Sequence, residues 1–347
     1  MDNTINSEFE QQLGQLGKIL AGKNHLLIII HDYPDPDAIM SAAALRYLVK
    51  NKYNLDSSIA YGGDIGRAEN RALVRILKIN MKQINRIKPD KYDIVAMVDT
   101  QPGVGNHSMP SNMRCNIVID HHPLKKAYAA DLLLVKPGLG GTATILVEWL
   151  RASNLPIQTD LAAGLAYAIS SETQYMGRDA TTPDIDAYLY VYSKANLKIL
   201  SQVMFPKLSR SHFLMLRSTL NNAVRYCNLI CSHLGDVPFP EIVAEMADFL
   251  VRHERISWSL CTGRFKDKLI LSLRTSNRNA KAYKLIRKLV VDDRTAGGHE
   301  MTAGGYILLQ GKKADLIEKE ITQKFAKILK HKDAEWKNLY EADIPFE

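Results

Sequence analysis

The segment "NIVIDHHP", residues 116–123, places three titratable side chains directly after a short apolar run. The continuous aliphatic run at 117–119 is typical of a strand that is covered on both faces. Asp120, His121 and His122 follow it at once. In open parallel sheets, ligands bind beyond the carboxyl ends of the strands. The triplet is therefore either an ordinary polar strand end or one part of a site that other strand ends complete.

The same pattern recurs on both sides of this segment. Apolar runs typical of strands are "HLLIII" at 25–30, "SSIAYGG" at 57–63 and "YDIVAMVDT" at 92–100. Helical periodicity separates them, as in "IMSAAALRYLVKN" at 39–51, "RAENRALVRILKI" at 67–79 and "TATILVEWLRAS" at 142–153. Strands that alternate with helices predict an α/β fold with a doubly wound parallel sheet.

A second, smaller α/β domain is predicted after a helix-rich stretch that carries no chemical motif. Strand-like runs lie at 226–235, 257–265 and 268–276, and helical ones at 240–253, 280–291 and 314–330. We expect an N-terminal catalytic domain at 1–190, a helical connector at 191–224, a substrate-binding domain at 225–330 and a charged tail at 331–347. The active site is expected in the cleft between the two domains.

Composition limits the class of protein. The chain has 347 residues with 45 Lys and Arg against 37 Asp and Glu, a net charge of +8. This balance suits an anionic partner such as a nucleotide, although surplus lysine also serves solubility. The four cysteines show no metal-ligand spacing, which indicates free thiols in a reducing compartment. Neither a signal peptide nor an apolar run of membrane-spanning length is visible, so we expect a cytoplasmic protein without a membrane partner.

Polar residues at the strand ends form a candidate metal site. His31, Asp35 and Asp37 follow the first strand, and Asp99 ends the strand at 92–100. The turn "SSETQ" at 170–174 adds Glu172. Carboxylates with some imidazole suit Mn²⁺, or Mg²⁺, better than structural zinc, and two such ions can promote an in-line phosphoryl displacement.

Each of these pieces has a simpler explanation when it is taken alone. Asp35 and Asp37, which follow prolines, are typical of a turn and a helix N-cap, and Asp99 of a strand-end cap. Their joint occurrence at successive strand ends with His121 is what favours a site. In the second domain, Gly297 and Gly298 of "TAGGHEMTAGGY" (295–306) expose backbone amides. This glycine loop, His299 and Arg274 are candidates for holding a phosphate, and a plain glycine turn is the alternative.

Together these motifs resemble those of a known family. "HDYPDPDA", "VDT", "DHHP" and "SSETQ", in this order and spacing, are similar to the four motifs of the DHH phosphoesterases. "AGGHEMTAGG" resembles the glycine-rich motif of the DHH-associated domain, which points to the RecJ-like and oligoribonuclease branch. The resemblance implies an Mn²⁺-dependent phosphodiesterase or phosphatase, with two ions expected.

The resemblance also implies roles for individual residues. It makes metal ligands of His31, Asp35, Asp37, Asp99, His121 and Glu172. It gives His122 the role of catalytic acid or phosphate ligand and Asp120 that of a support for the histidines. Arg274, Gly297, Gly298 and His299 would hold the substrate, and Arg67 and Asn70 would face the cleft.

Two positions depart from the family pattern. Glu172 stands where an aspartate is usual, and Ala296 replaces a glycine. The leading hypothesis is hydrolysis of short RNA or DNA oligonucleotides, dinucleotides or nucleotide phosphates such as 3′-phosphoadenosine 5′-phosphate. The alternatives are a nucleotide-binding or regulatory protein whose catalysis is impaired by Glu172, and an inorganic pyrophosphatase or polyphosphatase. The sequence leaves the oligomeric state open, with a homodimer among the options.

Overall fold

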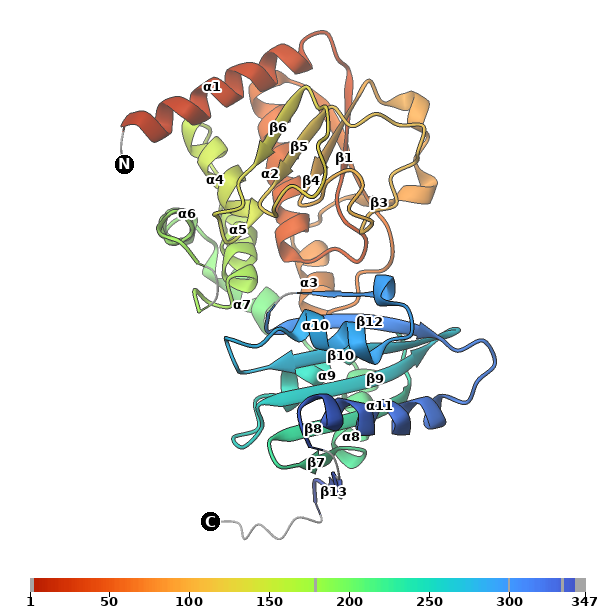
Figure 1. Ribbon diagram of the computed structural model, residues 1–347. Coiled ribbons are helices and arrows are strands. Elements are labelled where there is room, and N and C mark those ends of the chain that lie inside the picture. The colour runs from red at the N-terminus through yellow and green to blue at the C-terminus, as the bar shows by residue number, and fades with distance from the viewer. Residues whose placement is uncertain (1–2, 178–179, 299, 332–333, 341–347) are drawn as a thin grey trace. The chain divides into compact units, whose positions relative to one another are not determined.

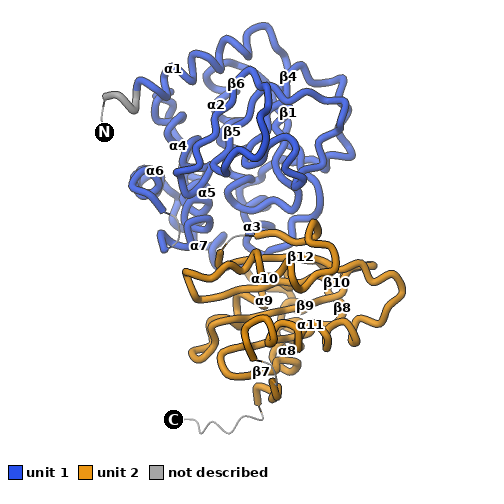
Figure 2. The backbone as a smooth tube through the Cα atoms, in the orientation of Figure 1, with its two compact units in different colours: residues 1–206 blue, residues 207–347 orange. Residues whose placement is uncertain are grey.

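The computed structural model describes residues 3–177, 180–298, 300–331 and 334–340, which divide between two compact units, 1–206 and 207–347 (Figure 2). The stretch predicted as a connector contributes to both. Helix α7 (Leu197–Met204) packs in unit 1 against α3 (Ala68–Ile76) and α5 (Thr159–Glu172), whereas α8 (Arg210–Asn221) packs in unit 2 against β8 (Leu229–Asp236). The predicted site between the domains stays a prediction.

Unit 1 contains a six-stranded parallel sheet in the order β3-β2-β1-β4-β5-β6 (Figure 1). The strands are β1 (His25–Ile29), β2 (Asp56–Tyr61), β3 (Met81–Gln83), β4 (Ile94–Val98), β5 (Ile117–Asp120) and β6 (Leu132–Val135). The parallel sheet predicted from the sequence is confirmed. The sequence reading missed β3 and β6, which span three and four residues and are too short for a pattern to be recognised.

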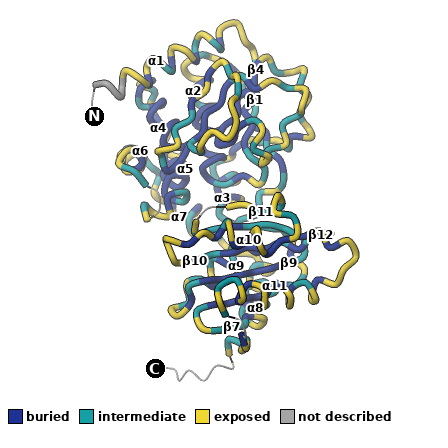
Figure 3. Tube along the Cα trace, in the orientation of Figure 1, coloured by how far each residue is buried: buried dark blue, intermediate teal, exposed yellow. Residues whose placement is uncertain are grey.

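The central strands are buried on both faces, which explains their unbroken apolar runs. In β1, Leu26 and Ile28 face the core formed with α2 (Pro36–Tyr53), α4 (Thr142–Ala152) and α5, whereas Leu27 and Ile29 face a second core. That second core is closed by short 3₁₀ turns and loops between residues 84 and 130. Helices α1 (Asn3–Leu20) and α6 (Thr182–Tyr192) pack outside α4 and α5. Figure 3 shows the buried strands at the centre of the unit.

Unit 2 contains a seven-stranded mixed sheet in the order β11-β12-β10-β9-β8-β7-β13, so the predicted second α/β domain is confirmed (Figure 1). Its remaining strands are β7 (Val224–Tyr226), β9 (Trp258–Phe265), β10 (Lys268–Thr275), β11 (Ala296–Gly298), β12 (Thr302–Leu308) and β13 (Lys337–Asn338). Helices α8 and α9 (Glu241–Leu250) border one core, and α10 (Ala282–Leu289) and α11 (Ala314–Ile328) border the other.

Two expectations for unit 2 differ from the structure. The glycine-rich segment predicted as a loop supplies β11 and β12, which pair antiparallel with Gly297 opposite Gly304. Small residues are needed here, because a Cβ on Gly305 would lie 2.9 Å from that of Ala296. The segment predicted as a tail also contributes to the sheet of the domain, since β13 pairs with β7.

Two further expectations concern the whole chain. The four cysteines are free, as the sequence predicted. Within the described residues, no helix is both long and apolar enough to cross a membrane.

Candidate metal centre

The loop after β1 and the first turn of α2 contain the first three candidate ligands, His31, Asp35 and Asp37. Asp35 is the N-cap of α2, and its Oδ1 accepts a hydrogen bond from the backbone N of Ala38 at 3.0 Å. Pro36 follows at the first helical position, where its missing N–H costs nothing. The capping role that the sequence suggested for Asp35 is thus real, and it fixes the direction of the carboxylate. Asp37, one residue into the helix, is only 1% exposed.

Asp99 directly follows β4 and has a backbone conformation that few residues adopt. Its φ is +57°, in the left-handed region that aspartate tolerates better than most side chains. The side chain is 2% exposed, and its Oδ1 accepts a hydrogen bond from the hydroxyl of Thr142 at 2.8 Å. Such strained positions cluster at functional sites, so Asp99 is placed as a site residue would be.

Two groups of ligand atoms meet at Asp99. Its Oδ2 lies 3.5 Å from Nε2 of His31, which lies equally far from Oδ2 of Asp35. Its Oδ1 lies 3.7 Å from Nε2 of His121, which is 4.0 Å from Oδ2 of Asp37. The structure therefore brings together five of the residues predicted as metal ligands, with one carboxylate between two sets.

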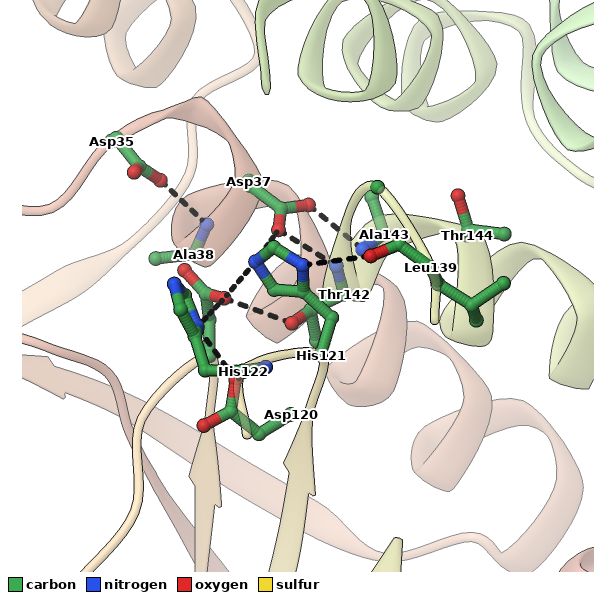
Figure 4. A network of polar contacts seen from close by, with 12 residues as sticks. Asp35, Asp37, Ala38, Asp120, His121, His122, Leu139, Thr142, Ala143 and Thr144 are labelled. Atoms are coloured by element: carbon green, nitrogen blue, oxygen red, sulfur yellow. Dashed lines mark hydrogen bonds and ion pairs between the residues drawn. The ribbon is translucent and has the colours of Figure 1, made fainter. Parts of the chain in front are cut away.

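The histidine rings are oriented by backbone carbonyls. Nδ1 of His31 lies 2.9 Å from the carbonyl oxygen of Asp32, and Nδ1 of His121 lies 3.1 Å from that of Leu139 (Figure 4). A carbonyl accepts only, so Nδ1 carries a hydrogen in both rings, and Nε2 is the atom that offers a lone pair to a cation once it carries no proton. Nε2 of His121 is buried and has no hydrogen-bond partner among the described residues. Such an orphaned atom beside two carboxylates fits a metal ligand.

Crowding of charges is visible in the pKa values of the site. Burial, followed by repulsion from Asp99, Glu172 and Asp35, holds the pKa of the Asp37 carboxyl well above its usual range. Burial alone would lower the pKa of His31, but the carboxylates of Asp35 and Asp99 raise it well above its usual value. Without cations the site therefore retains protons, as expected of carboxylates that need a positive charge between them.

His122 lies beside the ligands and is held differently. Its Nδ1 lies 2.9 Å from Oδ1 of Asp120, which also accepts the backbone N–H of His122 at 3.0 Å. Burial lowers the pKa of His122, but hydrogen bonding to Asp120 and the charges of Asp99, Asp120 and Glu172 raise it to about 9. The opposite holds for Asp120, where burial is outweighed by His122 and the pKa falls. The ring is 40% exposed and can present a proton to a bound group.

Glu172 is the last residue of α5, and its charge reaches the site. It contributes to the raised pKa values of both Asp37 and His122. The charge of the Glu172 carboxylate is therefore felt by Asp37 and by His122. Direct coordination by Glu172 stays a prediction.

The predicted substrate residues have varied surroundings. In unit 2, Arg274 forms an ion pair with Asp248 and donates to the hydroxyl of Ser272. Gly297 and Gly298 are exposed in β11, and His299 lies outside the described residues.

In unit 1, Arg67 is the N-cap residue of α3. Asn70 is only 5% exposed, and its Nδ2 donates to the carbonyl of Pro34 at 3.2 Å. Asn70 thus supports the loop that carries the metal ligands. The contacts of both groups with substrate stay predictions.

Some residues of the site were not recognised in the sequence. The turn at 139–144 contacts His121, Asp37 and Asp99, although the sequence reading took its glycines only as a helix start. Gln101 donates to the carbonyl of His122 and helps to lower the pKa of Asp120. A glycine pair immediately before a helix, at the carboxyl edge of a parallel sheet, was the available signal for this turn.

Comparison with known proteins gives one family match. Residues 25–169 match the model of the DHH family, N-terminal domain. Over 323 residues the chain is 31% identical to an uncharacterized protein of Methanocaldococcus jannaschii, covering 90% of this chain and 66% of that protein. Over 172 residues it is 28% identical to a probable manganese-dependent inorganic pyrophosphatase of Lactobacillus johnsonii, covering 49% of this chain and 54% of that protein. The chain thus spans less than two thirds of the length of either relative.

One solved structure resembles the whole fold. An exopolyphosphatase-related protein from Bacteroides fragilis superimposes with a TM-score of 0.74 over 92% of this chain and 98% of its own. The two sequences are 14% identical, so this likeness concerns the fold alone.

Proposed function

Because the chain belongs to the DHH family through its N-terminal domain, we propose that it is a manganese-dependent hydrolase of phosphoester bonds. The observation that carries this proposal is the position of Asp99, whose two carboxylate oxygens face separate ligand sets. Such a shared carboxylate suits a pair of divalent cations in phosphoryl transfer.

The assignment of ligands follows from the distances. His31 and Asp35 would hold one cation, Asp37 and His121 the other, and Asp99 would contact both. When bound, the cations would neutralise the carboxylates and polarise the phosphoryl group. The oxygen and imidazole donors match the preferences of Mn²⁺, with Mg²⁺ as the alternative.

His122 supplies the proton chemistry in this proposal. Asp120 is buried and lies within hydrogen-bond distance of Nδ1 of His122, so Nε2 of the ring faces away from Asp120. This orientation does not require a bound substrate. In the metal-free protein, hydrogen bonding to Asp120 and nearby carboxylates raise the pKa of His122 to about 9, and the bond to Asp120 favours a charged ring, which suits a donor to a phosphate oxygen or to the leaving group.

The substrates we propose are short oligonucleotides, dinucleotides or nucleotide phosphates. The net charge of +8 favours anionic ligands. The exposed glycines of β11 in unit 2 place no side chain in the way of a phosphate or a base that approaches the backbone.

The test is release of mononucleotides from two- to five-residue RNAs in Mn²⁺. We expect activity in the wild type and none in Asp99→Asn. Asp93→Asn is a matched control, because Asp93 is an exposed carboxylate just before the start of the same strand. Activity in Asp99→Asn equal to that of the wild type would refute the proposal.

A second candidate is hydrolysis of inorganic pyrophosphate, which the names of relatives such as the Lactobacillus johnsonii protein favour. Phosphate release from pyrophosphate, measured beside nucleotide release with the same samples, separates the two.

A third candidate, nucleotide binding with impaired catalysis, rests on Glu172. A large gain in turnover in Glu172→Asp would support it, whereas no gain would favour glutamate as a working ligand.

A further inference from the structure

The turn at 139–144 comprises the end of the loop after β6 and the first residues of α4, and it contacts three of the proposed ligands. The carbonyl of Leu139 accepts from the His121 ring, and the backbone N–H groups of Thr142 and Ala143 donate to Asp37 at 2.8 and 2.7 Å. The hydroxyl of Thr142 donates to Asp99. Figure 4 shows the contacts of Leu139 with His121 and of Thr142 and Ala143 with Asp37. Movement of this one turn would therefore shift an imidazole and two carboxylates together.

The turn approaches Asp37 closely. A Cβ added to Gly141 would lie 3.3 Å from Oδ1 of Asp37, so the backbone and the carboxylate fit with little space to spare. Two amide donors at a helix start also place positive partial charge against Asp37. The position of the turn thus matters for both the geometry and the electrostatics of the ligand.

A single buried side chain holds this turn from outside the site. Asp184, in the first turn of α6, is 0% exposed. Its Oδ2 accepts the backbone N–H of Gly140 at 2.8 Å, and its Oδ1 accepts the hydroxyl of Thr144 at 2.6 Å. The same carboxylate accepts the backbone N–H and the hydroxyl of Thr181, at 2.8 and 2.6 Å, in a capping box. An ordinary capping box needs only Thr181, so the other two bonds are additional.

We propose that Asp184 is a positioning residue for the metal centre, acting through the turn at 139–144. It has no contact with the ligands themselves, and its effect passes through Gly140 and Thr144 to the donors that hold Asp37. Because the Asp184 carboxylate is fully buried and accepts four hydrogen bonds, its place is fixed by strong, short contacts. The inference rests on the proposed metal-dependent function.

Two threonines give a matched test. Thr144 and Thr181 each donate one hydroxyl to Asp184 at 2.6 Å, but only Thr144 belongs to the turn. Thr144→Val removes the bond on the side of the turn, and Thr181→Val removes the bond on the side of the helix cap. Thr144→Ser retains the hydroxyl and serves as the conservative rescue. Asp184→Asn is the more severe variant, and the threonine variants keep the test valid if it does not fold.

The measurement is the dissociation constant for Mn²⁺, from the free-ion signal in electron paramagnetic resonance, beside the melting temperature of the metal-free protein. We expect Mn²⁺ to bind about tenfold more weakly to Thr144→Val and Asp184→Asn, the lower end of the range for groups that orient metal ligands. Binding to Thr181→Val and Thr144→Ser should stay within about twofold of wild type, even where Thr181→Val melts earlier.

The outcomes separate the inference from the function beneath it. Wild-type binding by Thr144→Val, or equal weakening in both valine variants, would overturn the positioning role and leave the proposed function intact. A wild-type protein that binds no Mn²⁺ would overturn the proposed function and the inference together.

Discussion

Replacing Asp120 by asparagine tests the electrostatics of the site without touching a proposed ligand. The carboxylate is 1% exposed and lies 2.9 Å from Nδ1 of His122. A hydrogen bond to a charged partner contributes about 1.5–3 kcal/mol. A rise in the pKa of His122 from 6.5 to about 9 corresponds to an upper bound of roughly 3 kcal/mol. Since the ring is 40% exposed, solvent screening reduces this, and we expect Asp120→Asn to lower the free energy of unfolding by about 1–2 kcal/mol at pH 6.

The effect has a defined direction with pH. The pKa of His122 is higher in the folded protein than the 6.5 of an unfolded chain. Its contribution to stability is therefore complete below about pH 6.5 and is lost as the pH rises through about 9. The pKa of Asp120 is lowered, so the contribution of this carboxylate requires a pH above its ordinary value of 3.8. The difference between wild type and Asp120→Asn should be largest near pH 6 and small at pH 10.

The assay is urea unfolding of the metal-free protein in EDTA at pH 6, 8 and 10. Asp93→Asn is the control, because Asp93 accepts hydrogen bonds from two backbone N–H groups, of Asn24 and His25, which do not titrate. Its destabilisation should not vary over this range. A loss of stability in Asp120→Asn that is the same at pH 6 and pH 10 would refute the charged pair as its cause.

Three further outcomes follow from the same geometry. The affinity for Mn²⁺ should increase with pH and binding should release protons, because the raised pKa values of Asp37 and His31 make protons compete with the cation; calorimetry in buffers of different ionisation enthalpy measures the release. Asp35→Asn should weaken Mn²⁺ binding and keep the cap bond to Ala38, whereas Asp35→Ala should also lose that bond, worth about 1 kcal/mol, and melt at a lower temperature than Asp35→Asn; equal melting temperatures of the two variants would contradict this. Glu172→Gln removes a negative charge that acts on the site, so Mn²⁺ should bind more weakly. The same change lowers the pKa of Asp37, so proton release should begin at lower pH; an unchanged binding isotherm would show that Glu172 acts elsewhere.

The sequence predicted the parallel sheet, and it predicted that most of the candidate ligands lie together, because both follow from local signals. A buried strand reads as an apolar run, and the carboxyl ends of parallel strands share one edge. His31, Asp99 and His121 could therefore be expected to lie together before any distance was known. The same reasoning could not decide whether Asp35 caps a helix or is a candidate ligand, because that depends on geometry. In the structure Oδ1 of Asp35 accepts the cap bond from Ala38, and its Oδ2 lies near His31.

Other features depended on contacts between segments that are distant in the chain. Asp184 lies 44 residues from Gly140, and only the packing of α6 near α4 makes that bond. In sequence, Thr181 and Asp184 look like an ordinary capping box, which they also are. The strands β11 and β12 were missed because glycines normally weaken strands, whereas here close backbone approach requires them.

The carboxylates of the site are each held by the protein itself, and this bears on how the site binds cations. Asp37 accepts two backbone N–H groups at the start of α4, Asp99 accepts the Thr142 hydroxyl, and Asp35 accepts the Ala38 N–H. Three carboxylates this close together would otherwise favour side chains that turn away from one another. Because these donors come from helix starts and a short turn, the ligands keep their arrangement when protons replace cations. We therefore expect the proposed centre to be preorganised by the fold, so that a cation that enters it displaces protons rather than rearranging the chain.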